Sequence, residues 1–307
     1  MAIKDACPHR KMAVQILVNG LVIGLLYALV ALGFSLVYSG TRIFNLAHGA
    51  IYTSAAYIFL VATRVGSNPS GPLAVIAPIL ITFLSLCILA AAVEFCVYRP
   101  LYRKKAPPLI AFISSIGLYI VAVNLLAWIF GNETRILRSG IESPILLGPV
   151  VITKIQIIQL LISTLLLSAT FLILKKTSLG RSIRALSDNP TLIGILGINP
   201  LRLRLAIFLL ASVLAAAASL LRAVEVGIDP NAGFQVVLIA SVAMIIGGVG
   251  SFSGTVWSAL FLGVIQNIFV WFLSAQWQYA ASFFVLVLIL LVRREGVFAA
   301  RMRLEEA

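Results

Sequence analysis

Long apolar runs joined by short polar connections dominate the pattern of this sequence. A helix needs roughly 20 apolar residues to cross a bilayer, and lipid offers no partner for exposed backbone groups, so helices are favoured. The short alternating segments of a membrane β-barrel are missing. The pattern predicts an all-α polytopic membrane protein with about eight transmembrane helices, drawn from apolar runs near 16–38, 73–97, 109–130, 155–174, 205–221, 234–246, 256–272 and 280–292.

Two stretches contain residues that disfavour a continuous membrane helix. The segment 41–63 carries Asn45, His48 and Gly49, and the segment 234–254 ends in GGVGSFSG. Glycine weakens a helix and permits close approach of two backbones. We therefore expect broken or re-entrant segments near 41–63 and 234–254.

Composition supports a membrane protein and sets the domain limits. Of 307 residues, 61% are apolar and 11% are charged, and the mean hydropathy is +1.09. Soluble domains carry about 25% charged residues, which this chain lacks. We expect a single membrane domain at 16–292, with a connecting loop at 175–204 and polar tails at 1–15 and 293–307.

The net charge of +13 is distributed as a topology signal. Lysine and arginine concentrate at 98–108, at 175–204 and after Val292, whereas 131–153 is balanced and 225–233 holds only acids. Basic loops stay in the cytoplasm, so these loops and the C-terminus are predicted to be cytoplasmic. Anionic lipid is the natural partner of such charges. Nucleic acid is disfavoured because the basic residues are spread over separate short loops.

The side of the N-terminus decides the number of crossings. Lys4, Arg10 and Lys11 favour a cytoplasmic tail, whereas the connection 65–72 has to be outside. Only one net crossing then fits before Thr63, which makes 41–63 re-entrant and gives eight full spans. The alternative is nine spans with the N-terminus outside.

Motifs for chemistry are missing from the sequence. It contains no GxxxxGK[ST] phosphate loop, and no HExxH, GxSxG or CxxC pattern. The three cysteines have no metal-ligand spacing. We therefore expect no catalytic residue, no metal site and no cofactor in this chain, and an energy source that lies elsewhere.

Three motifs in collinear order resemble one family. They are GFSLVYSGTRIFNLAHGAIYTSAAY at 33–57, GRSIRALSDNPTLIGILGIN at 180–199 and IIGGVGSFSGTVWSALFLGVIQN at 245–267. Glu94, Tyr98, Arg99 and Pro100 add a further similarity, although Phe95 stands where that family usually has a basic residue. Together these residues resemble the H-type permease subunit of high-affinity branched-chain amino-acid ABC transporters, and urea and amide permeases share the motifs.

The resemblance implies the translocation subunit of an ATP-driven importer in a bacterial inner membrane. Its implied partners are ABC ATPases that bind the ATP, a second permease subunit (a paralogue or a second copy) and a periplasmic or lipid-anchored solute-binding protein. Branched-chain amino acids are the first substrate expectation, and urea or short amides come next. An ion-coupled secondary transporter is the rival class, but only Glu94 lies near enough to the membrane to serve it.

The interrupted segments are the candidate substrate pathway. Broken helices near the membrane centre form permeation sites in many transporters. The alternative is structural: the polar residues brace a turn, and the glycines allow a helix break with close packing. The pathway candidates are Asn45, His48, Gly49, Gly247, Gly248, Gly250 and Gly254.

The loop 175–204 is the candidate contact with the ATPases. Its middle has the pattern of a short amphipathic helix, with Asn199 as a helix cap further along. Such a helix can dock into a groove of a partner, although a basic loop that only fixes topology is the alternative. The candidate coupling residues are Gly180, Arg181, Arg184, Ala185, Asp188, Asn189, Gly197 and Ile198.

One charged pair near an outer helix end receives a structural interpretation. Arg222 and Glu225 are three residues apart and are predicted to pair on one helix face. Alternatively, Arg222 extends toward the interface.

Overall fold

A computed structural model describes residues 7–65, 73–137, 144–147, 150–188 and 190–298. The described chain is almost entirely helical, which confirms the all-α class. The elements are α1 (Cys7–Thr41), α2 (Ala47–Val65), α3 (Leu73–Val93), the π-helix η1 (Glu94–Tyr98), α4 (Arg99–Arg103), α5 (Pro108–Phe130), β1 (Ile145–Leu147), β2 (Val150–Ile152), α6 (Lys154–Lys176), α7 (Ser178–Asp188), α8 (Pro190–Ile195), α9 (Pro200–Val226), α10 (Ala232–Gly247), α11 (Phe252–Phe272), the 3-10 helix η2 (Ala275–Trp277) and α12 (Gln278–Val292).

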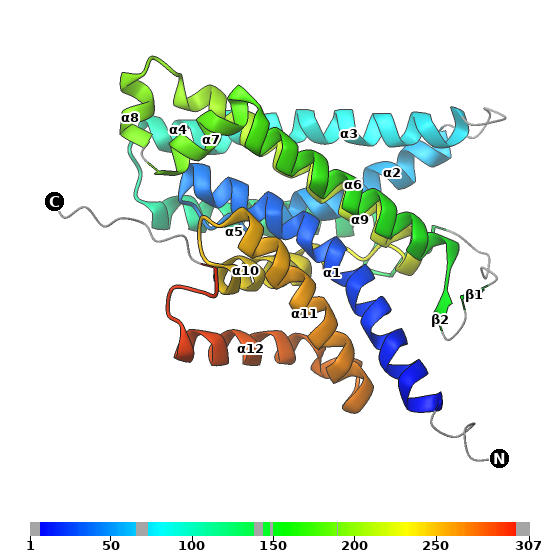
Figure 1. Cartoon of the computed structure of the whole chain (residues 1–307). Coiled ribbons are helices and arrows are strands. Elements are labelled where there is room, and N and C mark those ends of the chain that lie inside the picture. Colours follow the sequence, from blue (N-terminus) through cyan, green and yellow to red (C-terminus); the bar gives the residue numbers. More distant parts are fainter. Residues whose placement is uncertain (1–6, 66–72, 138–143, 148–149, 189, 299–307) are drawn as a thin grey trace, which may run out of the picture.

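The long helices run between two ends of the molecule (Figure 1). One end carries α4, α7 and α8 and is called the basic end here; the other carries the antiparallel pair β1–β2 and is called the hairpin end. Within the described residues, seven helices are long and apolar enough to cross a membrane. The shorter α10 and the less apolar α2 also run between the two ends.

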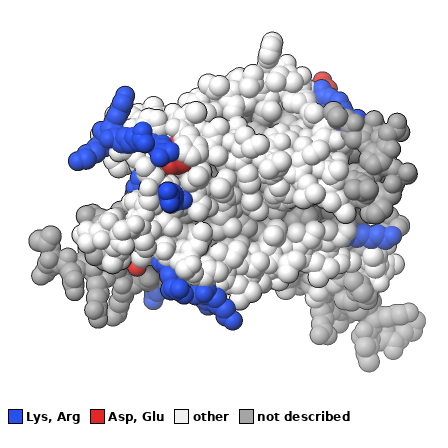
Figure 2. Space-filling view, turned by 90° about the horizontal axis from the view of Figure 1, so that it is seen from above, with Lys and Arg blue, Asp and Glu red and all other residues white. Residues whose placement is uncertain are grey.

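Charged side chains avoid the middle of the molecule. Figure 2 shows one face on which a broad uncharged zone separates lysine and arginine side chains, most of which lie toward the basic end. Exposed basic residues of that end are Arg42, Arg103, Lys104, Lys105, Lys175, Lys176, Arg181, Arg202, Arg293 and Arg294. The uncharged zone is what a membrane domain requires, since charges inside a bilayer are costly.

Helix α1 is the central element of the packing. In the most apolar stretch of α1, 83% of the residues are buried inside the molecule. The helix packs against α9, α10 and α11. Close approach to α11 depends on small residues: a Cβ on Gly263 would lie 2.5 Å from the Cα of Gly24. Small residues perform this role in membrane helix pairs, where packing replaces the hydrophobic effect.

Both predicted interruptions exist, but the first differs from the expectation. The chain leaves the helix at 42–46, where Arg42 has a φ of 57°, and α2 is then an uninterrupted helix of 19 residues. The break therefore lies at the start of the 41–63 segment, at the basic end. The second break, at 248–251, includes positive φ angles at Gly248 and Gly250.

The course of α1 bears on the number of crossings. At the hairpin end, Gln15 exchanges two hydrogen bonds with the backbone of Val151 in β2, at 2.9 and 2.8 Å. At the basic end, Arg42 donates to the carbonyl of Ser187 in α7 at 2.7 Å. A cytoplasmic tail before Ile16 and an outward 131–153 connection therefore cannot both hold. This geometry favours the nine-span alternative.

The described chain is also ordered on both sides of the predicted membrane domain 16–292, whose limits remain a prediction. Helix α1 begins at Cys7, so Cys7–Gln15 is helical. After α12, the N–H of Val297 donates to the carbonyl of Ile246 at 2.8 Å, which fixes the first residues of the C-terminal tail on the second break.

Candidate functional site

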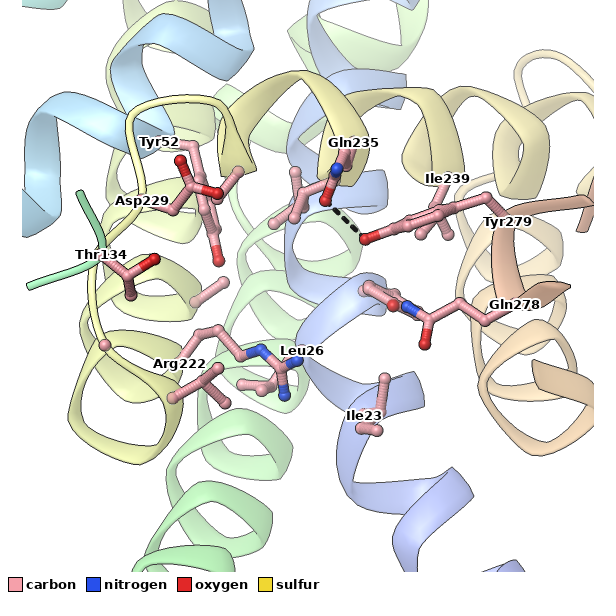
Figure 3. A pocket seen from close by; sticks show the side chains of 17 residues that line it. Ile23, Leu26, Tyr52, Thr134, Arg222, Asp229, Gln235, Ile239, Gln278 and Tyr279 are labelled. Carbon is pink, nitrogen blue, oxygen red and sulfur yellow. Dashed lines mark hydrogen bonds between the residues drawn. The ribbon is translucent and has the colours of Figure 1, made fainter. Parts of the chain in front are cut away.

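A cavity of about 240 Å³ lies between α1, α2, α9, α10 and α12 (Figure 3). Thr134, Gly227 and Asp229, from the connections at the hairpin end, complete its wall. This volume is just below the roughly 300–1,000 Å³ of sites for drug-sized ligands, so it suits a small solute. The apolar part of the lining comes from Ile23, Leu26, Val30, Ala218, Val226, Ala232, Val236 and Ile239.

Arg222 of α9 brings a positive charge into this cavity. Its Nη1 lies 3.6 Å from Oε2 of Glu225, which confirms the predicted pair. Glu225 is itself held by the side-chain amides of Gln156 and Gln159 in α6, at 3.2 and 3.1 Å. The remaining guanidinium N–H groups of Arg222 extend toward α1 in Figure 3.

Asp229 and Tyr52 form the opposite polar wall. Asp229 is half-buried, and its Oδ1 accepts from the N–H of Asn231 at 2.9 Å, which fixes the carboxylate in the connection between α9 and α10. The buried Tyr52 of α2 directs its hydroxyl into the cavity, between Asp229 and Arg222 in the view of Figure 3. Asp229 and Arg222 form no ion pair with each other in the described chain.

A hydrogen bond between α10 and α12 limits the cavity on its other side. The Tyr279 hydroxyl donates to Oε1 of Gln235 at 2.5 Å. Gln278 lies beside it in the lining. This contact joins the segments on either side of the second helix break.

The connection that carries Asp229 is held by a short backbone pairing. Arg135 and Ile228 exchange N–H···O bonds of 2.9 and 2.8 Å. Gly227 has a φ of 97°, which favours glycine, and its backbone passes so close to Arg135 that a Cβ would lie 2.9 Å from that carbonyl oxygen. The α9–α10 turn is therefore a defined part of the wall.

The predicted pathway residues near the first break lie outside the cavity lining. Asn45 and His48 are both 1% exposed. Oδ1 of Asn45 accepts from the Tyr98 hydroxyl at 2.6 Å, and His48 Nε2 would touch a Cβ on Gly33 at 3.2 Å. Gly49 packs on Gly233 of α10. Asn45 Nδ2 and His48 Nε2 are buried and have no hydrogen-bond partner among the described residues, and a role of these residues in the pathway remains a prediction.

The predicted glycines of the second break are also outside the cavity lining. A Cβ on Gly254 would lie 2.2 Å from the carbonyl oxygen of Gly247, so α10 and α11 meet backbone to backbone. Gly248 and Gly250 take positive φ angles of 89° and 91° in the turn. These glycines shape a tight helix–helix turn.

The candidate coupling residues form a compact unit at the basic end. Gly180 is packed against α6, where a Cβ would lie 2.4 Å from the carbonyl oxygens of Ile173 and Leu174. Arg184 donates to the Leu174 carbonyl, and Ala185 is half-buried. Ile183 and Leu186 are fully buried, which gives α7 the predicted amphipathic character.

The other coupling residues lie on the surface or in the following turn. Arg181 and Asp188 are exposed, and Asn189 lies outside the described residues. Gly197, with a φ of 76°, and Ile198 form the turn before α9, which Asn199 caps by accepting from the Leu201 N–H at 3.0 Å. Ile195 and Leu196 are exposed by 77% and 64% at the tip. Helices α7 and α8 thus present a mixed charged and apolar surface.

The sequence does not identify the cavity residues as a group. It predicts a structural role for Arg222 and gives no signal that Tyr52, Asp229, Gln235 and Tyr279 line one cavity. A charged residue near a membrane helix end was the available signal. The described residues contain no group of three or more His, Cys, Asp or Glu side chains that could hold a metal ion.

Comparison with known proteins gives a consistent family. The sequence model of a family described as "Branched-chain amino acid transport system / permease component" matches residues 16–292. The chain is 30% identical to the high-affinity branched-chain amino acid transport system permease protein BraD of Pseudomonas aeruginosa, over 92% of this chain and 94% of the relative. It is 29% identical to LivH of Escherichia coli, a permease protein of the same description, with the same coverage.

More distant similarities agree in part. The autoinducer 2 import system permease protein LsrC of Klebsiella pneumoniae is 29% identical, but over 66% of this chain and 57% of the relative. Among solved structures, PsaBC from Streptococcus pneumoniae in complex with Fab aligns with a TM-score of 0.50, at 12% identity, over 93% of this chain and 92% of that one. At that identity the likeness concerns the fold alone.

Proposed function

Because this chain belongs to the permease component family of branched-chain amino-acid transport systems, we propose that it translocates a branched-chain or related amino acid by alternating access, driven by separate ATPases. The family membership makes the chain a multi-pass membrane permease of the ABC class and a transport subunit. The solute, the coupling and the access mechanism are the proposal.

One structural connection carries this proposal. Helix α1 lines the cavity with residues between Ile23 and Val30, and just past its end Arg42 bonds to α7 through the Ser187 carbonyl. A displacement of α7 therefore acts on the helix that forms the cavity wall. Rigid, packed elements are what transmit such a displacement.

The proposed orientation follows the charges. We assign the basic end, with the end of α12, to the cytoplasm and the hairpin end to the outside. The start of α1 is then outside, and the cavity lies nearer the outer face. A solute-binding protein would deliver its solute there, and the ATPases would contact α7 and α8.

The partners remain those that the family implies. Two ATPase subunits would bind the ATP, so this chain is proposed to need no cofactor of its own. A second permease subunit, a paralogue or a second copy, would complete the pathway. Anionic lipid would surround the basic end.

Urea or a short amide is the alternative solute. The opposite charges of Arg222 and Asp229 in one small cavity favour a solute with two opposite charges over a neutral one. Ion-coupled secondary transport is the alternative mechanism, and the buried Glu94 carboxylate, which has no hydrogen-bond partner in the described chain, is the observation in its favour.

Uptake of labelled leucine into proteoliposomes tests the proposal. The permease is reconstituted with its candidate ATPases, second permease and binding protein, with and without ATP. The double variant Ile195→Ser/Leu196→Ser removes the exposed apolar tip and should lower uptake at least about tenfold, since buried apolar contacts are central to interfaces. Arg64→Gln is the control, because Arg64 is exposed near the C-terminal end of α2, away from α7 and α8.

Each outcome decides something. ATP-dependent uptake that is lost in the tip variant, while its monodisperse elution is kept, supports importer and coupling surface together. Uptake that is independent of ATP but requires an ion gradient overturns the proposal in favour of secondary transport. ATP-dependent uptake of urea but not of leucine overturns the proposed solute and leaves the proposed ATP-driven mechanism in place.

A further inference from the structure

We propose that Arg222 and Asp229 are the two charged poles of a binding site for a zwitterionic α-amino acid within the permease itself. This inference rests on the proposed function and adds the residues that recognise the solute. Arg222 would bind the α-carboxylate, Asp229 would bind the α-ammonium group, and the apolar wall would hold the side chain.

Arg222, the positive pole, is held in place but keeps guanidinium N–H donors that Glu225 does not engage. Glu225 lies 3.6 Å from one nitrogen of Arg222, and its two oxygens are engaged by the amides of Gln156 and Gln159. A guanidinium presents five N–H donors in a planar fork that matches a carboxylate. Glu225 therefore orients Arg222 and leaves donors directed into the cavity (Figure 3).

The negative pole has free capacity of its own. Asp229 receives one backbone N–H on Oδ1, and a carboxylate has about four acceptor positions. The Tyr52 hydroxyl lies between Asp229 and Arg222 in the view of Figure 3, and makes no hydrogen bond to another described residue. Both groups can accept N–H donors from an ammonium group.

The separation of the two poles is the central observation. Opposite charges that line one small cavity attract each other. Arg222 and Asp229 nevertheless form no ion pair. Glu225 holds the Arg222 guanidinium and the α9–α10 turn holds the Asp229 carboxylate, so the two charged groups line one cavity without contacting each other. A solute with one charge of each sign would neutralise both.

The remaining lining selects the side chain. Ile23, Leu26 and Val30 of α1 lie on the same cavity as Val236 and Ile239 of α10. An aliphatic side chain placed against them would bury apolar surface worth about 25 cal/mol per Å². A charged side chain would find no further partner on this wall.

Saturation-transfer NMR on the permease–ATPase complex in nanodiscs, without the binding protein, tests the assignment. The probes are leucine, leucinamide, which lacks the carboxylate, and N-acetyl-leucine, which lacks the ammonium group. The wild type should bind leucine about tenfold or more tightly than either analogue, since each lost charged hydrogen bond costs about that factor.

The variants should lose selectivity for one end of the solute only. Arg222→Gln should remove the preference for leucine over leucinamide and keep that over N-acetyl-leucine. Asp229→Asn should do the reverse. Arg64→Gln and Glu133→Gln, exposed charges that do not line the cavity, should leave both preferences unchanged.

Two results would overturn the site. One is a uniform loss of all three probes in either variant, which a merely structural role predicts. The other is no preference for leucine in the wild type. ATP-driven leucine uptake by the same preparation, with the binding protein added, distinguishes failure of this site from failure of the proposed function.

Discussion

At the scale of single residues, buried polar groups in this protein hold helices together. Asn45, in the 42–46 break, accepts from Tyr98 of η1 at 2.6 Å, and Gln266 of α11 donates to Ser282 of α12 at 2.6 Å. All four side chains are at most 2% exposed. In a membrane domain such bonds replace water as the partner of the polar group.

The Asn45–Tyr98 bond yields the first prediction. Tyr98→Phe leaves Oδ1 of Asn45 buried without its donor, so we expect a loss of roughly 1 kcal/mol, seen as a lower apparent Tm in detergent. Tyr38→Phe is the control, since the Tyr38 hydroxyl makes no hydrogen bond to a described residue. Equal melting of both variants would contradict a bracing role for Asn45.

Two glycines yield the second prediction. A Cβ on Gly233 would lie 2.1 Å from the Gly49 carbonyl oxygen, whereas a Cβ on Gly117 would meet nothing within 4 Å. Gly233→Ala should separate α2 from α10 and destabilise the protein by about 1–3 kcal/mol. Gly117→Ala should be neutral or stabilising, because alanine favours a helix. Chemical or thermal unfolding of the two variants in parallel checks the difference.

At the scale of elements, α7 is bound to the membrane domain from two sides. Its start packs on the end of α6 through Gly180, and its end receives Arg42 from the 42–46 turn. Ile183 and Leu186 fill the space between them. The element is thus fixed to the helices that it is proposed to move.

Loosening this attachment yields the third prediction. Gly180→Ala introduces a Cβ 2.4 Å from two α6 carbonyl oxygens, while a Cβ on Gly194 in α8 meets nothing within 4 Å. We expect Gly180→Ala to lower the solute transported per ATP hydrolysed severalfold, with ATPase activity retained. Gly194→Ala should behave as wild type. An unchanged ratio in Gly180→Ala would argue against coupling through the α6–α7 contact.

At the scale of the whole molecule, the two ends differ in charge and in contacts. Figure 1 places the start of α1 at the hairpin end and the end of α12 at the basic end. The chain therefore begins and finishes its helical course on opposite sides. Nine crossings with an outer N-terminus satisfy this arrangement and the charge rule together.

Accessibility of introduced cysteines yields the fourth prediction. In a variant whose Cys7, Cys87 and Cys96 are replaced, Ala13→Cys and Glu133→Cys should react with a membrane-impermeant maleimide in intact spheroplasts. Arg181→Cys should react only after permeabilisation. All three positions are exposed, so burial does not explain a difference. Protection of Ala13→Cys in intact spheroplasts would contradict the outer N-terminus.

The sequence by itself determined what depends on local patterns. Apolar length predicts the helices, because each span satisfies its own backbone, and the glycines of 247–254 predict the second helix break. The polar residues of 41–63 predict a first break, which the structure places at 42–46, before His48. The amphipathic α7, the Asn199 cap and the Arg222–Glu225 pair are also short-range features, each within two to four residues along one helix.

Only the tertiary structure decided which distant residues share a space. Tyr52, Arg222, Asp229 and Tyr279 come from four segments, and no spacing in the sequence announces their convergence on one cavity. The position of the start of α1 beside β2 likewise depends on a contact between Gln15 and Val151, 136 residues apart. Three basic residues in a tail are a weak local signal, whereas packing of α1 fixes both of its ends. The cavity and the position of the start of α1 are thus consequences of long-range packing, which a one-dimensional pattern does not encode.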